Sequence, residues 1–306
     1  MFSLLGVKID NLSLREVLER VESFMRDNKQ HYIVTVNPEF LVLAQKDKDF
    51  RKILNKADLS VPDGIGIVFA SLLKKNNLIR SRVTGVDLFE EICYLASMKN
   101  WNIFLYGARE ETREEVKNNL LRKYPELRVN CLSENGFLND YKINDLNTKG
   151  ILFVALGAAK QEKWINENLE NMPNIKLAVG VGGTFDFISG NVSRAPVILR
   201  KIGLEWLWRL IIQPKRFPRI INAVIIFPFL VIKEIIKNSK FQITNYLPSQ
   251  ILQSKTWEGR QYQNSNVQNS KLNKSSQKSN VPLQRSEARP VKLGGKSQIY
   301  KSKVKS

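Results

Sequence analysis

Histidine and cysteine are scarce in this sequence. The 306 residues include one histidine, His31, and two cysteines, Cys93 and Cys131. A nucleophilic triad centred on histidine, or a zinc site with several imidazole or thiolate ligands, is therefore disfavoured. His31 begins an apolar run and is interpreted as structural. Both cysteines lie in apolar patterns, so we expect buried free thiols, which are typical of a reducing compartment.

Long hydrophobic runs are also missing, and no secretory leader is expected. The longest apolar stretch, Ile220–Ile232, has 13 residues and contains Asn222 and Pro228. It is shorter than the roughly 20 residues that a helix needs to cross a bilayer. The segment Met1–Asp10 has neither a basic start nor a long apolar core. We therefore expect a cytoplasmic protein.

Acidic residues are few relative to basic ones. There are 48 Lys and Arg against 29 Asp and Glu, which gives a net charge of +19. Residues 240–306 alone hold 13 Lys and Arg against 2 Asp and Glu, among many Ser, Asn and Gln. Such a composition buries too little apolar surface to offset its ordering entropy, so residues 239–306 are predicted to form a basic disordered tail. Simple solvation, an anionic membrane surface and nucleic acid all remain open as its role.

The rest of the chain alternates apolar, β-rich runs with amphipathic helical patterns, such as Gly85–Met98 and Glu110–Tyr124. This alternation predicts an α/β fold over residues 1–194: a Rossmann-like, largely parallel sheet with helices on both faces. The expected strands are His31–Val36, Leu59–Val61, Ile103–Tyr106, Leu127–Cys131, Ile151–Leu156 and Lys176–Val179.

A helical appendage is expected over residues 195–238, where Trp, Phe and Ile are mixed with Arg. Pro218 and Pro228 should break or kink it. The composition suits an interfacial membrane element, because basic and aromatic side chains together favour the headgroup region. It also suits an ordinary helical subdomain that packs on the core.

Polar residues of the types used in catalysis follow four of the expected strands. In parallel sheets, ligands bind outside the carboxyl ends of the strands, so these residues should share one edge. The four sets are Thr35, Asn37, Pro38 and Glu39; Pro62, Asp63 and Gly64; Gly157, Lys160, Gln161 and Glu162; and Gly180, Gly182 and Gly183 with Thr184 and Asp186. Their convergence predicts an active site.

The glycine cluster at residues 180–183 indicates a site for a phosphate-bearing ligand. Glycines after a strand allow close approach of a ligand to the backbone, and a helix start offers N–H groups to an anion. Arg209, Arg216 and Arg219 add fixed positive charge further along. The cluster is not a G-x-G-x-x-G fingerprint, and no acidic residue follows a strand about 20 positions later. A nicotinamide cofactor is therefore disfavoured.

Two acidic motifs are candidates for chemistry. Asp63 lies in a tight strand-to-helix turn, where its carboxylate could act as a general base or cap the helix Ile65–Leu73. Position alone does not separate these interpretations. The motif Asp47-Lys48-Asp49 matches the D-x-D pattern of metal-dependent sugar transferases, but its charged surroundings favour a solvated helix face. No metal is implied.

Six motifs together resemble the WecG/TagA/CpsF glycosyltransferases, in the right order, over roughly residues 1–235. They are TVNPEF from Thr35, VPDGIG from Val61, RVTGVDL from Arg82, ALGAAKQEKW from Ala155, GVGGTFDFISG from Gly180, and RAP from Arg194 followed by GLEWLWR. The sequence departs from the family pattern at Ala159, where proline is frequent, and at Ala108, where a second glycine is common.

The resemblance implies an inverting transferase that needs no metal or other cofactor. It would move a sugar, typically N-acetylmannosamine, from a UDP donor to a polyprenyl-diphosphate-linked sugar in the synthesis of cell-surface polysaccharide such as teichoic acid. The enzyme would lie on the inner face of the cell membrane, against an anionic surface, and self-association as a homo-oligomer is suggested. Nucleic acid is not an expected partner. The alternative is a non-catalytic protein that binds a nucleotide sugar or nucleic acid through its basic tail.

The resemblance also implies roles for individual residues. Asp63 matches the catalytic base, and Thr35 and Asn37 match polar residues on the acceptor side. The residues expected around the donor nucleotide and its diphosphate are Gln161, Gly182, Gly183 and Thr184, with Arg82 as a further pocket residue. Without a metal, the charge of the leaving UDP must be met by backbone N–H groups and arginines, a role that falls to Arg209, Arg216 and Arg219.

Overall fold

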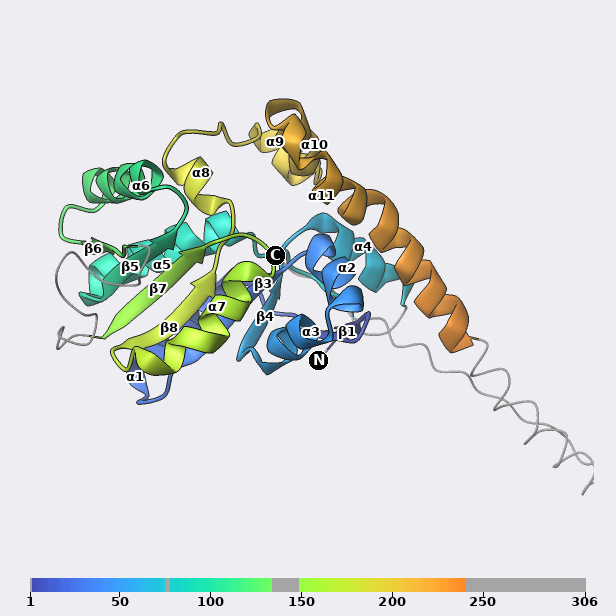
Figure 1. The fold of residues 1–306 in the computed structure, drawn as a ribbon, viewed down its shortest axis with the longest axis horizontal. Helices are drawn as coiled ribbons and strands as arrows, with labels where there is room; N and C mark the ends of the chain where they lie inside the picture. The colour runs from blue at the N-terminus through green and yellow to red at the C-terminus, as the bar shows by residue number, and fades with distance from the viewer. Residues whose placement is uncertain (1, 75–77, 134–148, 240–306) are drawn as a thin grey trace, which may run out of the picture. The chain divides into compact units, whose positions relative to one another are not determined.

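The computed structural model describes residues 2–74, 78–133 and 149–239 (Figure 1). Nearly all of the predicted basic tail, residues 240–306, lies outside this part, so that prediction is not tested. The described chain is built on one six-stranded sheet, and a short antiparallel hairpin of β1 (Phe2–Leu4) and β2 (Val7–Ile9) precedes it.

All neighbouring strands of the main sheet run parallel, which confirms the α/β prediction. The strand order is β4-β3-β8-β7-β5-β6. The bounds are His31–Val36 for β3, Leu59–Pro62 for β4, Asn102–Gly107 for β5, Arg128–Cys131 for β6, Gly150–Ala155 for β7 and Ile175–Gly180 for β8. The bounds of β3 are those expected, and each of the other strands differs from its expected range by no more than one residue at either end.

The central strands are buried on both faces, as their unbroken apolar sequences require. One face is covered by α2 (Pro38–Lys46), α3 (Lys48–Lys56), α4 (Ile65–Leu73) and α7 (Lys160–Asn168). The other is covered by α1 (Leu14–Arg26), α5 (Gly85–Lys99), α6 (Glu110–Lys123) and α8 (Thr184–Ile188). Because successive side chains of a strand point to opposite faces, Ile33 enters one core and Val34 the other.

This arrangement places a crevice beyond the carboxyl ends of β3 and β8, which are hydrogen-bonded neighbours in the sheet. The helix after β3, α2, packs on one face, while the helix after β8, α8, sends Phe185 into the core of the other face. Chains that leave adjacent strands in opposite directions produce a crevice at the carboxyl edge. The fold therefore places the segments after β3 and β8 on either side of one opening.

Three minor predictions can be compared with the structure. His31 is structural as expected: it is buried, stacks on Phe24 and hydrogen-bonds Asp27 and Asp58. The cysteines are both free, but only Cys93 is fully buried; Cys131 lies at the end of edge strand β6 and is partly exposed, so that expectation was wrong for it.

The D-x-D pattern lies at the start of α3, and the predicted solvated helix face describes Asp49 but not Asp47. The Asp47 side chain accepts hydrogen bonds from the backbone N–H groups of Asp49 and Phe50 and so caps α3. It also pairs with Lys163 at 2.6 Å, while Asp49 is largely exposed.

The C-terminal segment is helical, as expected, but Pro228 does not break it. After α9 (Val197–Lys201) and α10 (Glu205–Ile212), α11 (Phe217–Ile221) runs through a π-helical turn at Asn222–Ile226 into a helix over 227–239. The wider π turn accommodates a proline, which lacks the N–H that an α-helix needs. No helix within the described ranges is long and apolar enough to cross a membrane.

A substitution in the centre of the sheet tests this fold. Phe153 of β7 is fully buried, and its ring lies 4.5 Å from that of Phe89, centroid to centroid. Phe153→Ala should lower the free energy of unfolding by about 3–5 kcal/mol, because it removes buried area and leaves a cavity. Urea denaturation measures the change. Phe229→Ala, at a residue that is 65% exposed, is the matched control and should shift stability by about 0.5 kcal/mol or less.

Candidate functional site

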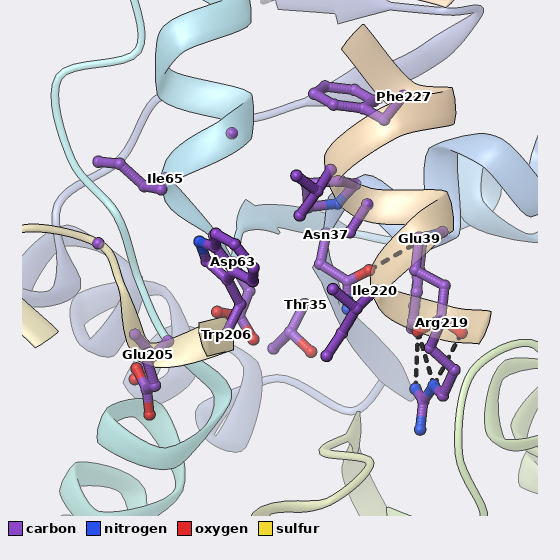
Figure 2. Close-up of a pocket in the computed structure, with 18 of the residues that line it drawn as sticks. Thr35, Asn37, Glu39, Asp63, Ile65, Glu205, Trp206, Arg219, Ile220 and Phe227 are labelled. Carbon is purple, nitrogen blue, oxygen red and sulfur yellow. Dashed lines mark hydrogen bonds and ion pairs between the residues drawn. The ribbon is translucent and has the colours of Figure 1, made fainter. Parts of the chain in front are cut away.

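A cavity of about 550 Å³ opens at the carboxyl edge of the sheet (Figure 2). It is bounded by the ends of β3, β4 and β8, by α4 and by the C-terminal helices. Every site residue expected from the sequence lines it, from segments far apart in the chain: Thr35, Asn37, Asp63, Arg82, Gln161, Gly182, Gly183, Thr184, Arg209, Arg216 and Arg219. The structure thus brings the whole expected set together in one cavity.

Asp63 follows β4 directly and does not cap α4. The N-cap position of that helix is Gly64, which has a φ of 119° and makes no side-chain capping bond. A residue other than glycine would be strained there. The Asp63 carboxylate instead accepts a hydrogen bond from the backbone N–H of Gly85, 3.3 Å away at the start of α5. The helix-cap alternative is therefore wrong, and the carboxylate is left beside the cavity.

The surroundings of Asp63 favour its protonated form. The pKa of the Asp63 carboxyl is raised to about 6, chiefly by burial and in part by the nearby carboxylate of Glu205. The Gly85 N–H bond and the positive charges of Arg82 and Arg209 act in the opposite direction. An aspartate with a pKa near neutrality can both take up and release a proton at physiological pH.

The acceptor-side candidates, Thr35 and Asn37, and the donor-side candidate Thr184 all hydrogen-bond to backbone groups. The hydroxyl of Thr35 donates to the carbonyl oxygen of Gly180 across the β3–β8 pair at 3.1 Å. The Asn37 side chain accepts from the N–H of Phe40 at 3.1 Å and so caps α2. Thr184 is buried, and its hydroxyl donates to the carbonyl of Val181 at 2.8 Å. The Thr35 bond joins the carboxyl ends of β3 and β8, whereas the other two bonds are local to the segments that follow these strands.

Gln161 lies beneath the glycine turn and is buried. Its Oε1 accepts a hydrogen bond from the N–H of Gly182 at 2.9 Å, and its Nε2 donates to Glu162 at 2.7 Å. The side-chain amide is thus engaged with the protein on both sides. Its visible role is to hold the turn.

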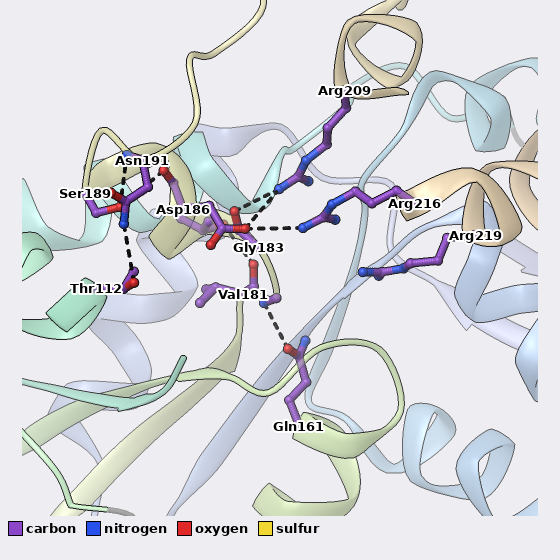
Figure 3. A network of polar contacts seen from close by, with 12 residues as sticks. Thr112, Gln161, Val181, Gly183, Asp186, Ser189, Asn191, Arg209, Arg216 and Arg219 are labelled. Carbon is purple, nitrogen blue, oxygen red and sulfur yellow. Dashed lines mark hydrogen bonds and ion pairs between the residues drawn. The ribbon is translucent and has the colours of Figure 1, made fainter. Parts of the chain in front are cut away.

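The three arginines reach the cavity from the C-terminal helices (Figure 3). Arg209 of α10 donates to the carbonyl of Gly183 at 2.9 Å, and its guanidinium lies 4.3 Å from the centre of the Phe187 ring. Arg216 pairs with Asp186 at 3.2 Å. Burial and the charge of Arg216 lower the pKa of Arg209 to about 10, which still leaves it cationic at neutral pH.

Arg219 of α11 pairs with a different carboxylate. It contacts both oxygens of Glu39, which follows β3, at 2.7–2.9 Å. Planar two-point contacts of this kind also suit phosphate groups. A cationic cluster of Arg209, Arg216 and Arg219 therefore faces the end of β8. Two of its members, Arg216 and Arg219, are paired with protein carboxylates.

Sequence reasoning missed Glu205 as a site residue. It is the glutamate of the GLEWLWR motif, lies in the cavity wall, and pairs with Arg82 at 3.7 Å and with Arg194 at 3.8 Å. Arg194 in turn contacts Asp87 at 2.6 Å. The sequence signal that could have identified Glu205 was its position between Arg194 and Arg209, in adjoining motifs.

An apolar wall on one side of the cavity was also missed. It is formed by Ile65, Phe69 and Leu73 of α4 together with Val224, Phe227, Val231 and Ile232 of the C-terminal helix. The spacing was a readable signal: intervals of four residues on α4, and of three and four on the C-terminal helix, place these side chains on one helix face. The cavity is therefore polar and cationic at the sheet edge and apolar between the helices.

No group of three or more His, Cys, Asp or Glu side chains in the described part of the chain is placed to hold a metal ion. What the cavity does contain is one carboxylate with a raised pKa beside several fixed cations. Such a combination can accept a proton from an attacking hydroxyl and stabilise negative charge on a leaving group.

Comparison with known proteins agrees with these features. The model of the "Glycosyl transferase WecG/TagA/CpsF family" matches residues 2–241. An N-acetylglucosaminyldiphosphoundecaprenol N-acetyl-beta-D-mannosaminyltransferase of Bacillus subtilis (strain 168) is 35% identical over 217 residues, which is 69% of this chain and 84% of the relative. A protein of the same name from Staphylococcus aureus (strain MRSA252) is 31% identical over 237 residues, or 75% of this chain and 91% of the relative. The chain belongs to the WecG/TagA/CpsF family of glycosyltransferases.

Proposed function

We propose that this enzyme transfers N-acetylmannosamine from a UDP donor to a polyprenyl-diphosphate-linked N-acetylglucosamine, with inversion, and that Asp63 is the general base. The names of the relatives support the transferred sugar and the acceptor. The single observation that carries the mechanism is that Asp63 and the arginine cluster line one cavity. A base and a cationic leaving-group site are the two elements that a metal-independent transfer requires.

In the proposed reaction, a hydroxyl of the acceptor sugar gives its proton to the Asp63 carboxylate. The hydroxyl oxygen forms a bond to the anomeric carbon of the donor sugar, and the bond from that carbon to the UDP oxygen breaks. UDP leaves with the bonding electrons. Arg216 and Arg219 would then exchange their present carboxylate partners for the diphosphate, and Arg209, held at the Gly183 carbonyl, would help them to neutralise its negative charge.

The appendage supports a location at a membrane surface. Residues Ile225, Phe229, Ile232 and Ile236 are all at least half exposed and recur at intervals of four, three and four, so they form one face of the C-terminal helix. The same helix turns Phe227 and Val231 into the core. The appendage, residues 195–238, would rest on the anionic inner face of the cell membrane while the lipid tail of the acceptor stays in the bilayer.

Two further expectations concern self-association and a non-catalytic role. Self-association as a homo-oligomer is suggested only by the family resemblance. The alternative of a non-catalytic protein that binds a nucleotide sugar or nucleic acid through its tail is not favoured, because the chain belongs to a family of transferases. The tail on which it depends lies outside the described residues.

Replacing Asp63 tests the proposed base. Asp63→Asn should lower the rate of sugar transfer by at least about a hundredfold, because the amide cannot accept the proton. The measurement is transfer from UDP-N-acetylmannosamine to a short-chain lipid-diphosphate acceptor. Asp49→Asn, at an exposed carboxylate of α3, is the control and should leave transfer unchanged. Undiminished transfer by Asp63→Asn would remove Asp63 from the mechanism.

The raised pKa of Asp63 predicts the acid limb of the pH profile. Since the base must be ionised, kcat/KM should rise with pH through a midpoint near the Asp63 pKa of about 6. Glu205→Gln removes a negative charge that raises this pKa, so the midpoint should move to lower pH. Steady-state rates between pH 4.5 and 8 give both midpoints. An unchanged or higher midpoint in Glu205→Gln would contradict this assignment.

The exposed helix face predicts membrane binding. Ile225→Ser combined with Phe229→Ser should lower partitioning onto vesicles containing phosphatidylglycerol by at least about tenfold, since each side chain contributes about 1.5–3 kcal/mol when fully buried. Sedimentation with vesicles measures the bound fraction. Met98→Ser is the matched control, because Met98 on α5 is 62% exposed, close to the 64% of Ile225. Equal losses in both variants would argue against a specific docking face.

A further inference from the structure

Glu162 is a fully buried carboxyl group that the proposed mechanism does not use. It lies on α7, and its Oε1 accepts a hydrogen bond from Gln161 Nε2 at 2.7 Å. Its Oε2 is buried without a hydrogen-bond partner in the described structure. A buried polar atom without a partner reduces stability, so packing alone does not explain a glutamate here.

The Gln161–Glu162 pair packs directly on β8 where that strand enters the cavity. A Cβ atom at Gly180 would lie 2.6 Å from Gln161 Nε2 and 2.7 Å from Glu162 Oε1, closer than any side chain allows. The glycine therefore makes room for the two side chains. In return, they fix the backbone of the turn that follows.

A chain of hydrogen bonds runs from this pair to the arginine cluster. Gln161 Oε1 accepts from the N–H of Gly182, and the carbonyl of the next residue, Gly183, accepts from Arg209 Nη2. Gly182 has a φ of 52°, a conformation that favours glycine. Because Glu162 accepts the hydrogen bond from Gln161 Nε2, the amide oxygen Oε1 is the end that faces the turn. Loss of Glu162 would free the amide to rotate.

We propose that Glu162 is a positioning residue: it orients the Gln161 amide, which holds the glycine turn so that Gly183 presents its carbonyl oxygen to Arg209. This inference rests on the proposed function only in that Arg209 meets the charge of the leaving UDP. Burial raises the pKa of Glu162 to about 8, so the group is a neutral acid at pH 7. A neutral glutamine can take its place in the hydrogen bond.

Three variants on α7 test the role. Glu162→Leu keeps a buried side chain of similar size but removes the acceptor for Gln161, and it should raise the donor KM about tenfold, the effect of losing one buried hydrogen bond. Glu162→Gln retains an acceptor oxygen and should stay within about threefold of the wild type. Glu167→Leu, on the exposed side of the same helix, should leave kinetics unchanged. If Glu162→Leu lowers the melting temperature but leaves KM and kcat alone, Glu162 is merely structural and the inference fails.

A double-mutant cycle identifies the route of the effect. If Glu162 acts through Arg209, combining Glu162→Leu with Arg209→Ala should be no worse in kcat/KM than Arg209→Ala alone. Effects that multiply would overturn the relay. The same cycle can be measured without substrate from the midpoints of urea denaturation. If Glu162 acts through Arg209, the effects of the two substitutions on stability should also be non-additive. A wild-type chain that transfers no sugar would overturn the proposed function instead, while the urea cycle would still decide the relay.

Discussion

The contact between the C-terminal helices and the turn after β8 is the interaction on which the candidate site depends. Arg209 reaches the carbonyl of Gly183, and Arg216 reaches Asp186. The Gly183 side of this contact has no space for a side chain, since a Cβ there would meet both guanidinium groups. The C-terminal helices and the turn after β8 are thus in direct van der Waals and hydrogen-bond contact. Without this contact the cavity would lack its cationic wall.

The positive charges in that wall are compensated by neighbouring carboxylates. Several arginines facing one cavity repel one another, and burial weakens their hydration. Asp186 and Glu39 compensate by pairing with them. In the proposed reaction a diphosphate, which carries charge of the same sign, would take the place of these carboxylates.

The division of the cavity into a polar and an apolar part suits a substrate with both characters. Asp63 and the glycine turn lie at the sheet edge, whereas Phe69 and Phe227 line the space between α4 and the C-terminal helix. A lipid-linked sugar has a reactive polar head joined to an apolar chain. The architecture is consistent with a transferase that works where water meets the bilayer, which agrees with the exposed apolar helix face.

Much of the fold and most of the site residues could be predicted from the sequence. Unbroken apolar runs such as Ile151–Ala155 are strands buried on both faces, and parallel strands bring their carboxyl ends to one edge. That is why the strand pattern alone was enough to group Thr35, Asp63 and Gln161. The motifs carried the family, and the glycine cluster together with the arginines further along predicted a phosphate site, which stays a prediction.

Other features depended on contacts between distant segments, which local sequence does not specify. The helix-cap interpretation of Asp63 was excluded by its hydrogen bond with the N–H of Gly85, 22 residues away, and by the absence of a capping bond on α4. Glu205 became a site residue only because α10 folds back over Arg82. Pro228 is preceded by a π-helical turn, and its neighbours Phe227 and Val231 pack into the core. Local sequence determined the strands, helices and reactive groups, whereas tertiary packing decided the burial and neighbours of each group, and these set its pKa and its partners.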